Sequence, residues 1–121
     1  MSKRLLVHVI TGVENPTRAS LGLLVARSAL EDGYEVDVFV AGDGVSMLRP
    51  SSAEQMQGVG LGLVADHLEA LKKGKAGLYA SALSAKARGL EGDDLVELGF
   101  KPSTPNVLID LVFKSDRTLI Y

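Results

Sequence analysis

The stretch that decides the fold runs from Lys75 to Leu90 and reads KAGLYASALSAKARGL. Its first part, Ala76–Ala80, is short and apolar, as in a strand buried on both faces. The following part, Ser81–Arg88, has the pattern of a short helix that ends at Gly89. Ser81 stands where strand becomes helix, which is the place where open α/β sheets carry their functional groups.

Other segments of the chain are predicted to be strands of the same sheet. Leu5–Ile10 is a continuous, mostly apolar run, as expected of a parallel strand covered by helices on both faces. Tyr34–Ala41 alternates valines with two acidic residues, which predicts a strand nearer the sheet edge with one face partly wet. Thr118–Tyr121 would be the last strand, and residues 92–100 could hold a short helix and a brief strand. Within the first run, we expect His8 to be a structural imidazole hydrogen-bonded under a helix.

Helices are predicted between these strands. Asn15 is a good N-cap with Pro16 in the first helical position, and apolar residues then recur at helical spacing until Gly33. A second helix is indicated over 61–71, and His67 falls between its apolar positions, which predicts an exposed side chain.

Two further segments are harder to assign. Residues 107–113 fit strand or helix by periodicity alone, and the preceding Ser103 and Pro105 favour a capped helix. Residues 45–60 resemble a long mobile connection beside the strand ends. Its apolar residues Met47, Leu48 and Met56 are a candidate contact surface for a partner, or they pack on the protein's own core.

The alternation of strands and helices predicts an α/β protein. We expect a three-layer α/β/α sandwich with a mainly parallel sheet of four to five strands, formed by residues 1–121 as a single domain. A chain of 121 residues can bury a sizeable core without a disulfide or a metal.

Composition narrows the class of partner. Thirteen basic and fifteen acidic residues give a net charge of −2 without a basic run, so we expect no nucleic-acid partner. The apolar run 5–10 is too short to span a bilayer, and we expect a cytoplasmic protein that does not bind membranes. The chain has no cysteine.

Several catalytic and cofactor motifs are missing. The glycines of 58–62 do not follow the first strand, so they make no dinucleotide site, and the chain has no GxxxxGK[ST] phosphate loop. The flanks of Ser81 lack the glycines of a hydrolase nucleophile elbow. The two histidines have no metal-ligand spacing. We therefore expect no catalytic residue, no metal and no cofactor.

Three turns should meet at the carboxyl edge of adjacent strands, namely Thr11–Thr17, Gly42–Gly44 and Ala80–Ala82. Their hydroxyl, amide and backbone N–H groups suit a small polar or anionic ligand. Ser81 is also explained as a helix N-cap, and Asp43 as a turn residue whose charge opposes an anion. The predicted ligand-binding residues are Thr11, Asn15, Thr17, Asp43, Gly44, Ser81 and Ala82.

Three segments together resemble the DsrE/DsrF-like family of small α/β proteins. They are ENPTRASLGLLVARSALEDGYEVDVFVAGDGV (14–45), HLEALKKGKAGLYASALSAKARGL (67–90) and SDRTLIY (115–121). The resemblance implies a parallel sheet with helices on both faces and assembly as a homotrimer, a hexamer or a mixed oligomer. It also implies that sulfur-relay members carry a persulfide on a cysteine at or next to the position of Ser81.

Serine cannot form or pass on a persulfide, because that chemistry requires a thiolate. The leading hypothesis is a non-catalytic homo-oligomer, a trimer or hexamer, with a small-ligand pocket. One alternative is a sulfur-relay accessory or enzyme that acts through Ser81 or through a cysteine of a partner. Another is a structural adaptor.

Overall fold

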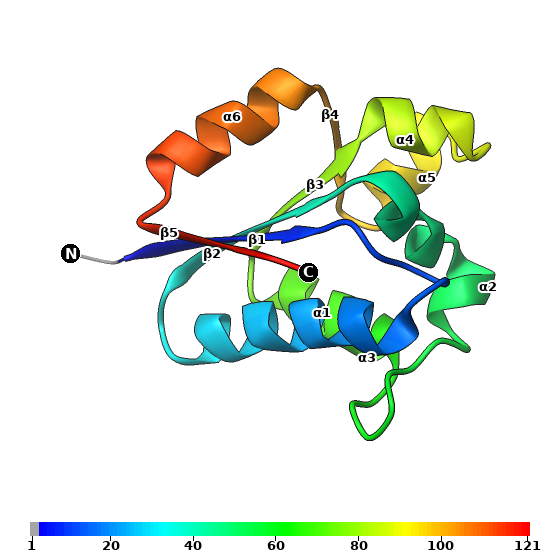
Figure 1. The fold of residues 1–121 in the computed structure, drawn as a ribbon, viewed down its shortest axis with the longest axis horizontal. Coiled ribbons are helices and arrows are strands. Elements are labelled where there is room, and N and C mark those ends of the chain that lie inside the picture. The colour runs from blue at the N-terminus through cyan, green and yellow to red at the C-terminus, as the bar shows by residue number, and fades with distance from the viewer. Residues whose placement is uncertain (1–2) are drawn as a thin grey trace.

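The computed structural model describes residues 3–121, in which five parallel strands form one sheet in the order β4-β3-β2-β1-β5 (Figure 1). The strands are β1 (Arg4–Val9), β2 (Glu35–Val40), β3 (Gly77–Ser81), β4 (Lys101–Ser103) and β5 (Arg117–Ile120). Helices lie on both sides of this sheet. The predicted three-layer α/β/α fold with a parallel sheet is therefore confirmed.

Helices connect every pair of consecutive strands. They are α1 (Pro16–Glu31), the 3₁₀ helix η1 (Gly42–Leu48), α2 (Pro50–Ala53), α3 (Val64–Lys73), α4 (Ala82–Ala87), α5 (Gly92–Glu97) and α6 (Pro105–Lys114). In Figure 1, α1 and α3 lie below the sheet and α6 crosses above it. The ambiguous segment 107–113 is thus helical, as Pro105 indicated. None of the helices within residues 3–121 has the length and apolarity of a membrane span.

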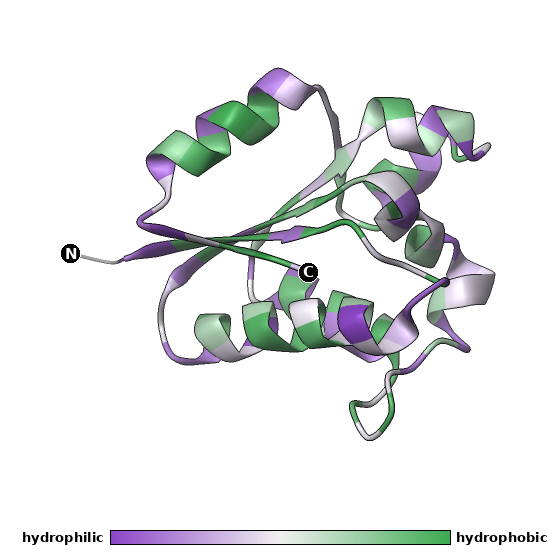
Figure 2. Cartoon of the chain, viewed as in Figure 1, coloured by the Kyte–Doolittle hydropathy of each residue, from purple (hydrophilic) through white to green (hydrophobic). Residues whose placement is uncertain are grey.

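The sheet separates two apolar clusters of unequal size. The larger packs the valines of β1 and β2 against α1 and α3, with Leu23 and Leu71 fully buried. The smaller consists of Leu6, Phe39 and Leu111 under α6. Figure 2 shows the hydrophobic strands in the middle of the molecule and an α6 that is hydrophobic around much of its circumference. Part of the apolar surface of α6 has no cover within the described residues, since Ile109 is 54% and Phe113 85% exposed.

The prediction that 34–41 is a partly wet strand near the edge is wrong. β2 is the middle strand of the sheet, and its residues are buried from Val36 to Val40. The alternation misled because one of its acidic residues, Asp37, is itself buried, with an exposed fraction of 3%.

Asp37 is tolerated inside the sheet because Arg4 of β1 neutralises it. Arg4 Nε donates to Asp37 Oδ2 over 2.8 Å, and this carboxylate raises the pKa of Arg4 above its ordinary value. Gly77 of β3 makes room for the pair, since a Cβ there would lie 2.1 Å from Asp37 Oδ1. A buried charge must be paired, and here the counter-charge lies on the neighbouring strand β1.

The first part of the connection over 45–60 is folded against the core, whereas Val59 near its end is 88% exposed. Met47 and Leu48 are fully buried in η1, and Met56 is 8% exposed. The prediction that these side chains form a contact surface for a partner is therefore wrong, and the alternative that they pack on the protein's own core is confirmed.

Both histidines depart from their predicted surroundings. His67 is buried, not exposed, because the segment before α3 folds over it and its Nε2 donates to the Leu61 carbonyl over 2.7 Å. His8 is half-buried against the edge of Phe39, with ring centroids 5.7 Å apart, and burial lowers its pKa. Its Nε2 has no hydrogen-bond partner within residues 3–121, contrary to the prediction.

We predict that Arg4→Met lowers the free energy of unfolding by about 1–3 kcal/mol, less than for a fully buried pair because Arg4 is partly exposed. The loss leaves the Asp37 carboxylate buried without a counter-charge. Arg27→Met removes the exposed ion pair with Glu31 and should cost at most about 0.5 kcal/mol. Urea unfolding of both variants measures this, and equal losses would contradict the assignment.

Candidate functional site

The carboxyl ends of β1, β2 and β3 lie side by side. In the strand register, Val9 pairs with Val40 and Val40 pairs with Ala80. The three strands therefore end at the same level, and the turns that follow them begin next to one another. This confirms the prediction that the three turns meet at one edge of the sheet.

Hydrogen bonds join the turn after β1 to the turn after β2. Ser46 Oγ accepts from the Val13 N–H over 3.1 Å and donates to the Asp43 carbonyl over 2.6 Å. The two turns approach so closely that a Cβ on Gly12 would lie 2.1 Å from the Asp43 carbonyl oxygen. A Cβ on Gly44 would lie 2.6 Å from the Val9 carbonyl oxygen. Glycine is required at both positions.

A second set of contacts joins the turn after β2 to α4. Ser84 Oγ accepts from the Gly42 N–H over 2.8 Å, and Ser84 N donates to Ser81 Oγ over 3.1 Å. Ser81 is therefore the N-cap of α4. This confirms the capping role that was predicted for it beside the ligand-binding role. Arg88, at the end of α4, binds the Asp43 carboxylate at 2.8 Å.

The predicted ligand-binding residues do not all share one position. Asp43 and Gly44 lie in the turn that is bonded to α4, which Ser81 and Ala82 begin. Asn15 caps α1, with its Oδ1 accepting from the Arg18 N–H over 3.2 Å.

The two threonines of the set differ. Thr17 Oγ1 is turned toward a different loop, where it accepts from the Val59 N–H over 3.4 Å. Thr11 Oγ1 is buried and has no hydrogen-bond partner within residues 3–121. Thr11 is therefore the member of the set whose hydroxyl is both buried and unpaired.

Both carboxylates of the turns, Glu14 and Asp43, have partners within the chain. Glu14 accepts from the Gly12 N–H over 2.6 Å. This backbone donor is one that we expected to bind an anionic ligand, and it is already bonded to a side chain of the protein. The charge of Asp43 is offset by Arg88. Residues 3–121 contain no group of three or more His, Asp or Glu side chains that could hold a metal ion.

Ser81 is not arranged as a nucleophile. Its Oγ has the Ser84 N–H as hydrogen-bond partner, and in the described part of the chain no imidazole or carboxylate contacts it. His67 is bonded to Leu61 and His8 lies against Phe39. A serine without an adjacent base retains the low reactivity of a free hydroxyl. Ser81 therefore caps α4, and the described residues around it do not form a hydrolase triad.

Sequence reasoning missed Ser46 and Ser84, the two hydroxyls that connect the turns. Ser84 lies three residues after Ser81, the spacing of an N-cap bond, which gave a local signal. Nothing in the sequence indicated that its hydroxyl also reaches Gly42, because that contact spans 42 residues.

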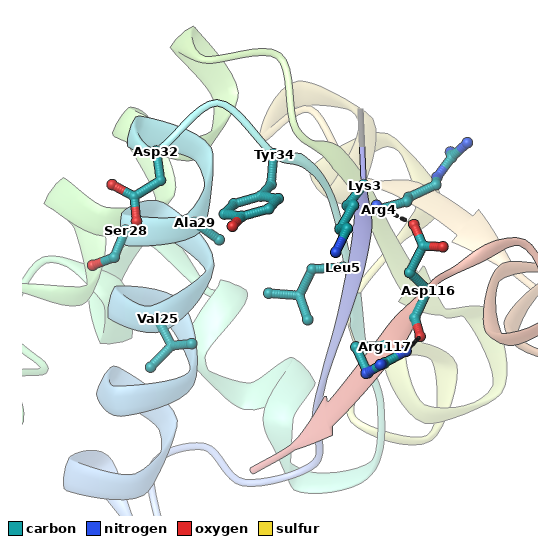
Figure 3. A pocket seen from close by; sticks show the side chains of 10 residues that line it. All are labelled: Lys3, Arg4, Leu5, Val25, Ser28, Ala29, Asp32, Tyr34, Asp116 and Arg117. Carbon is teal, nitrogen blue, oxygen red and sulfur yellow. Dashed lines mark hydrogen bonds between the residues drawn. The ribbon is translucent and has the colours of Figure 1, made fainter. Parts of the chain in front are cut away.

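Cavities of the described residues coincide only in part with these turns. A cavity of about 240 Å³ beside α4 includes Ala82 and no other residue of the predicted set. A larger one, of about 510 Å³, lies at the opposite end of β1 (Figure 3). There Leu5, Val25 and Tyr34 form an apolar wall, and Arg117 and Asp116 contribute charges.

Comparison with known structures supports the fold. The ychN protein from E. coli superposes with a TM-score of 0.79 at 18% identity, with each chain covered completely. MTH1491 from Methanobacterium thermoautotrophicum, described as of unknown function, gives 0.71 at 19% identity, covering 99% of this chain and all of its own. BT1422 from Bacteroides thetaiotaomicron gives 0.71 at 12% identity, covering 97% and 94%. No curated protein sequence matches the chain.

Fold and turns together define a class: a parallel α/β sandwich in which polar turns join at the carboxyl edge of three adjacent strands. The sequence profile of the DsrE/DsrF-like family matches residues 3–121. The chain therefore belongs to the DsrE/DsrF-like family, as its sequence resemblance implied.

We predict that Gly12→Ala lowers the free energy of unfolding by about 1–3 kcal/mol, because the new Cβ forces apart the turns after β1 and β2. Gly92→Ala is the matched control. Its Cβ would have Pro102 as nearest neighbour at 3.9 Å, so it should leave stability unchanged or raise it by up to about 1 kcal/mol. Urea unfolding compares the two, and a neutral Gly12→Ala would disprove the close contact.

Proposed function

We propose that this protein is a cytoplasmic, non-catalytic homo-oligomer of the DsrE/DsrF-like family that binds a small polar or anionic ligand at the carboxyl edge of its sheet. The observation that carries the proposal is Ser81. It ends β3 and caps α4, at or next to the position where sulfur-relay relatives carry their cysteine.

The hydroxyl of Ser81 cannot carry sulfur as the thiolate of a cysteine does. A persulfide forms when a polarisable thiolate attacks sulfur, and the hydroxyl of serine has a far higher pKa and is much less nucleophilic toward sulfur. The chain has no cysteine elsewhere that could replace it. The surrounding framework is nevertheless kept, since Ser84 and Gly42 still join α4 to the neighbouring turn.

A ligand at this edge is supported by one unsatisfied group and one balanced charge. The buried Thr11 hydroxyl has no partner within residues 3–121, and buried hydroxyls are nearly always hydrogen-bonded. Arg88 offsets the negative charge of Asp43, which otherwise opposes an anion. A small molecule with both donor and acceptor groups fits these conditions better than a multiply charged anion does.

Self-association is supported by exposed apolar side chains. Phe113 at the end of α6 is 85% exposed and Ile120 of β5 is 65% exposed. Grouped apolar side chains of this size on a protein surface often mark an interaction site. A contact with further copies of the chain would cover them.

We predict that the purified protein has the mass of a trimer or a hexamer in native mass spectrometry and retains a small molecule that denaturation releases. The matched comparison is Thr11→Val, which keeps the shape of the side chain and removes its hydroxyl. It should lower the retained fraction without altering the assembly. A clean monomer with no bound molecule would contradict both parts of the proposal.

The position of Ser81 favours one alternative, a sulfur-relay accessory. A thiol at this position would lie at the start of a helix and would have a lowered pKa. If the site is still shaped for sulfur, Ser81→Cys incubated with a sulfur donor gains the mass of one sulfur atom. Thr104→Cys, at the N-cap of α6, is the control, because a thiol there also lies at the start of a helix. We expect the two thiols to react equally slowly, and selective uptake at position 81 would favour the accessory instead.

A further inference from the structure

The two edges of the sheet differ in how they are protected against pairing with another strand. β4 has only three residues, and it carries Lys101 and Pro102, both of which discourage an added strand. β5 has no proline, and all four of its residues are exposed. Leu119 and Ile120 in β5 are 41% and 65% exposed. The β4 edge is therefore blunted, whereas the β5 edge is open.

The backbone of β5 offers hydrogen-bonding groups on that open side. Tyr121 donates its N–H to the His8 carbonyl, and its own carbonyl accepts from the Ile10 N–H. Alternate residues of a strand point their amides the same way, so Leu119 also faces β1. Thr118 and Ile120 then direct their N–H and C=O groups away from the sheet. Within residues 3–121, no strand pairs with that side.

Apolar surface flanks this edge on both faces of the sheet. On the α6 side, Phe113 stands exposed shortly before β5 begins. On the α1 side, the cavity of about 510 Å³ opens between Val25 of α1, Leu5 of β1 and Arg117 of β5 (Figure 3). A strand added to β5 would cover apolar groups on both faces while it satisfied the free backbone groups.

We propose that the open edge of β5 pairs with β5 of a second copy of this chain, antiparallel and about a twofold axis, and thereby joins the two sheets. This inference rests on the proposed homo-oligomer and names its contact. The register that uses both outward-facing residues of β5 in each copy places Leu119 opposite Leu119 of the partner copy. Thr118 then lies opposite Ile120 of that copy, so both outward-facing amides of each strand are used.

Charge also favours a second copy in this register. Arg117 is the one charged residue of β5, and it falls opposite Tyr121 of the partner copy rather than opposite another arginine. A contact of this kind is isologous and joins copies in pairs. If the chain also forms a threefold contact elsewhere, the two contacts together give a hexamer. A simple trimer does not contain the β5–β5 contact.

Cross-linking tests the contact directly, because the chain has no cysteine of its own. In the proposed register the two Leu119 Cα atoms form a non-hydrogen-bonded pair, about 4.5 Å apart, which a disulfide can span. Leu119→Cys should therefore form a covalent dimer rapidly under mild oxidation at low protein concentration. Lys101→Cys on the β4 edge is the matched control and should stay monomeric in a denaturing gel. Equal cross-linking at both positions, or none at 119, overturns the proposal.

Native mass spectrometry supplies a second, independent readout. Thr118→Pro removes an outward N–H and leaves the pairing with β1 in place, so the assembly should fall to half its mass. Thr118→Ala keeps the N–H and should retain the full assembly. An assembly unchanged by Thr118→Pro overturns the β5 contact and leaves the homo-oligomer standing, whereas a monomeric wild type overturns both. If Thr118→Pro does not fold, the Leu119→Cys cross-link decides alone.

Discussion

The equal register of β1, β2 and β3 is the constraint on which the rest of the structure depends. Parallel strands need long crossover connections, and these bring all carboxyl ends to one edge of the sheet. Because Val9, Val40 and Ala80 lie in one row, three separate turns begin at the same height. Gly12 and Gly44 then allow the turns to touch. The site is thus a consequence of backbone pairing before any functional side chain is considered.

Within that frame, the position of Ser81 carries two separate chemical demands. Its Oγ accepts the helix N–H of Ser84, a task that depends on a small side chain with a hydrogen-bond acceptor. Sulfur transfer depends instead on a polarisable thiolate, which oxygen does not replace. Capping and transfer are separate demands on one position, and a serine side chain meets only the first. Family membership therefore predicts the geometry here better than it predicts chemistry.

Much of the fold could be predicted from the sequence, because local signals agreed with the tertiary structure. Asn15 and Pro16 begin α1, and the join at Ser81 lies where the pattern indicated. The errors arose where distant residues changed the meaning of a local pattern. Asp37 reads as exposed until Arg4 of another strand neutralises it, and His67 reads as exposed until the loop before α3 covers it. The Gly42–Ser84 bond had no local signal at all.

Hydrogen-bond satisfaction separates the two regions to which we assign roles. At the carboxyl edge most donors are already used within the chain: Gly12 by Glu14, Val13 by Ser46 and Gly42 by Ser84. These bonds leave few backbone donors free, and the buried Thr11 hydroxyl is one unpaired group there, which suits the small ligand that we propose. Along β5 the outward backbone groups form an unused row flanked by apolar side chains, which suits an extended partner. The number of polar groups that the described residues leave unpaired is thus the basis on which we propose a small ligand at one region and an extended partner at the other.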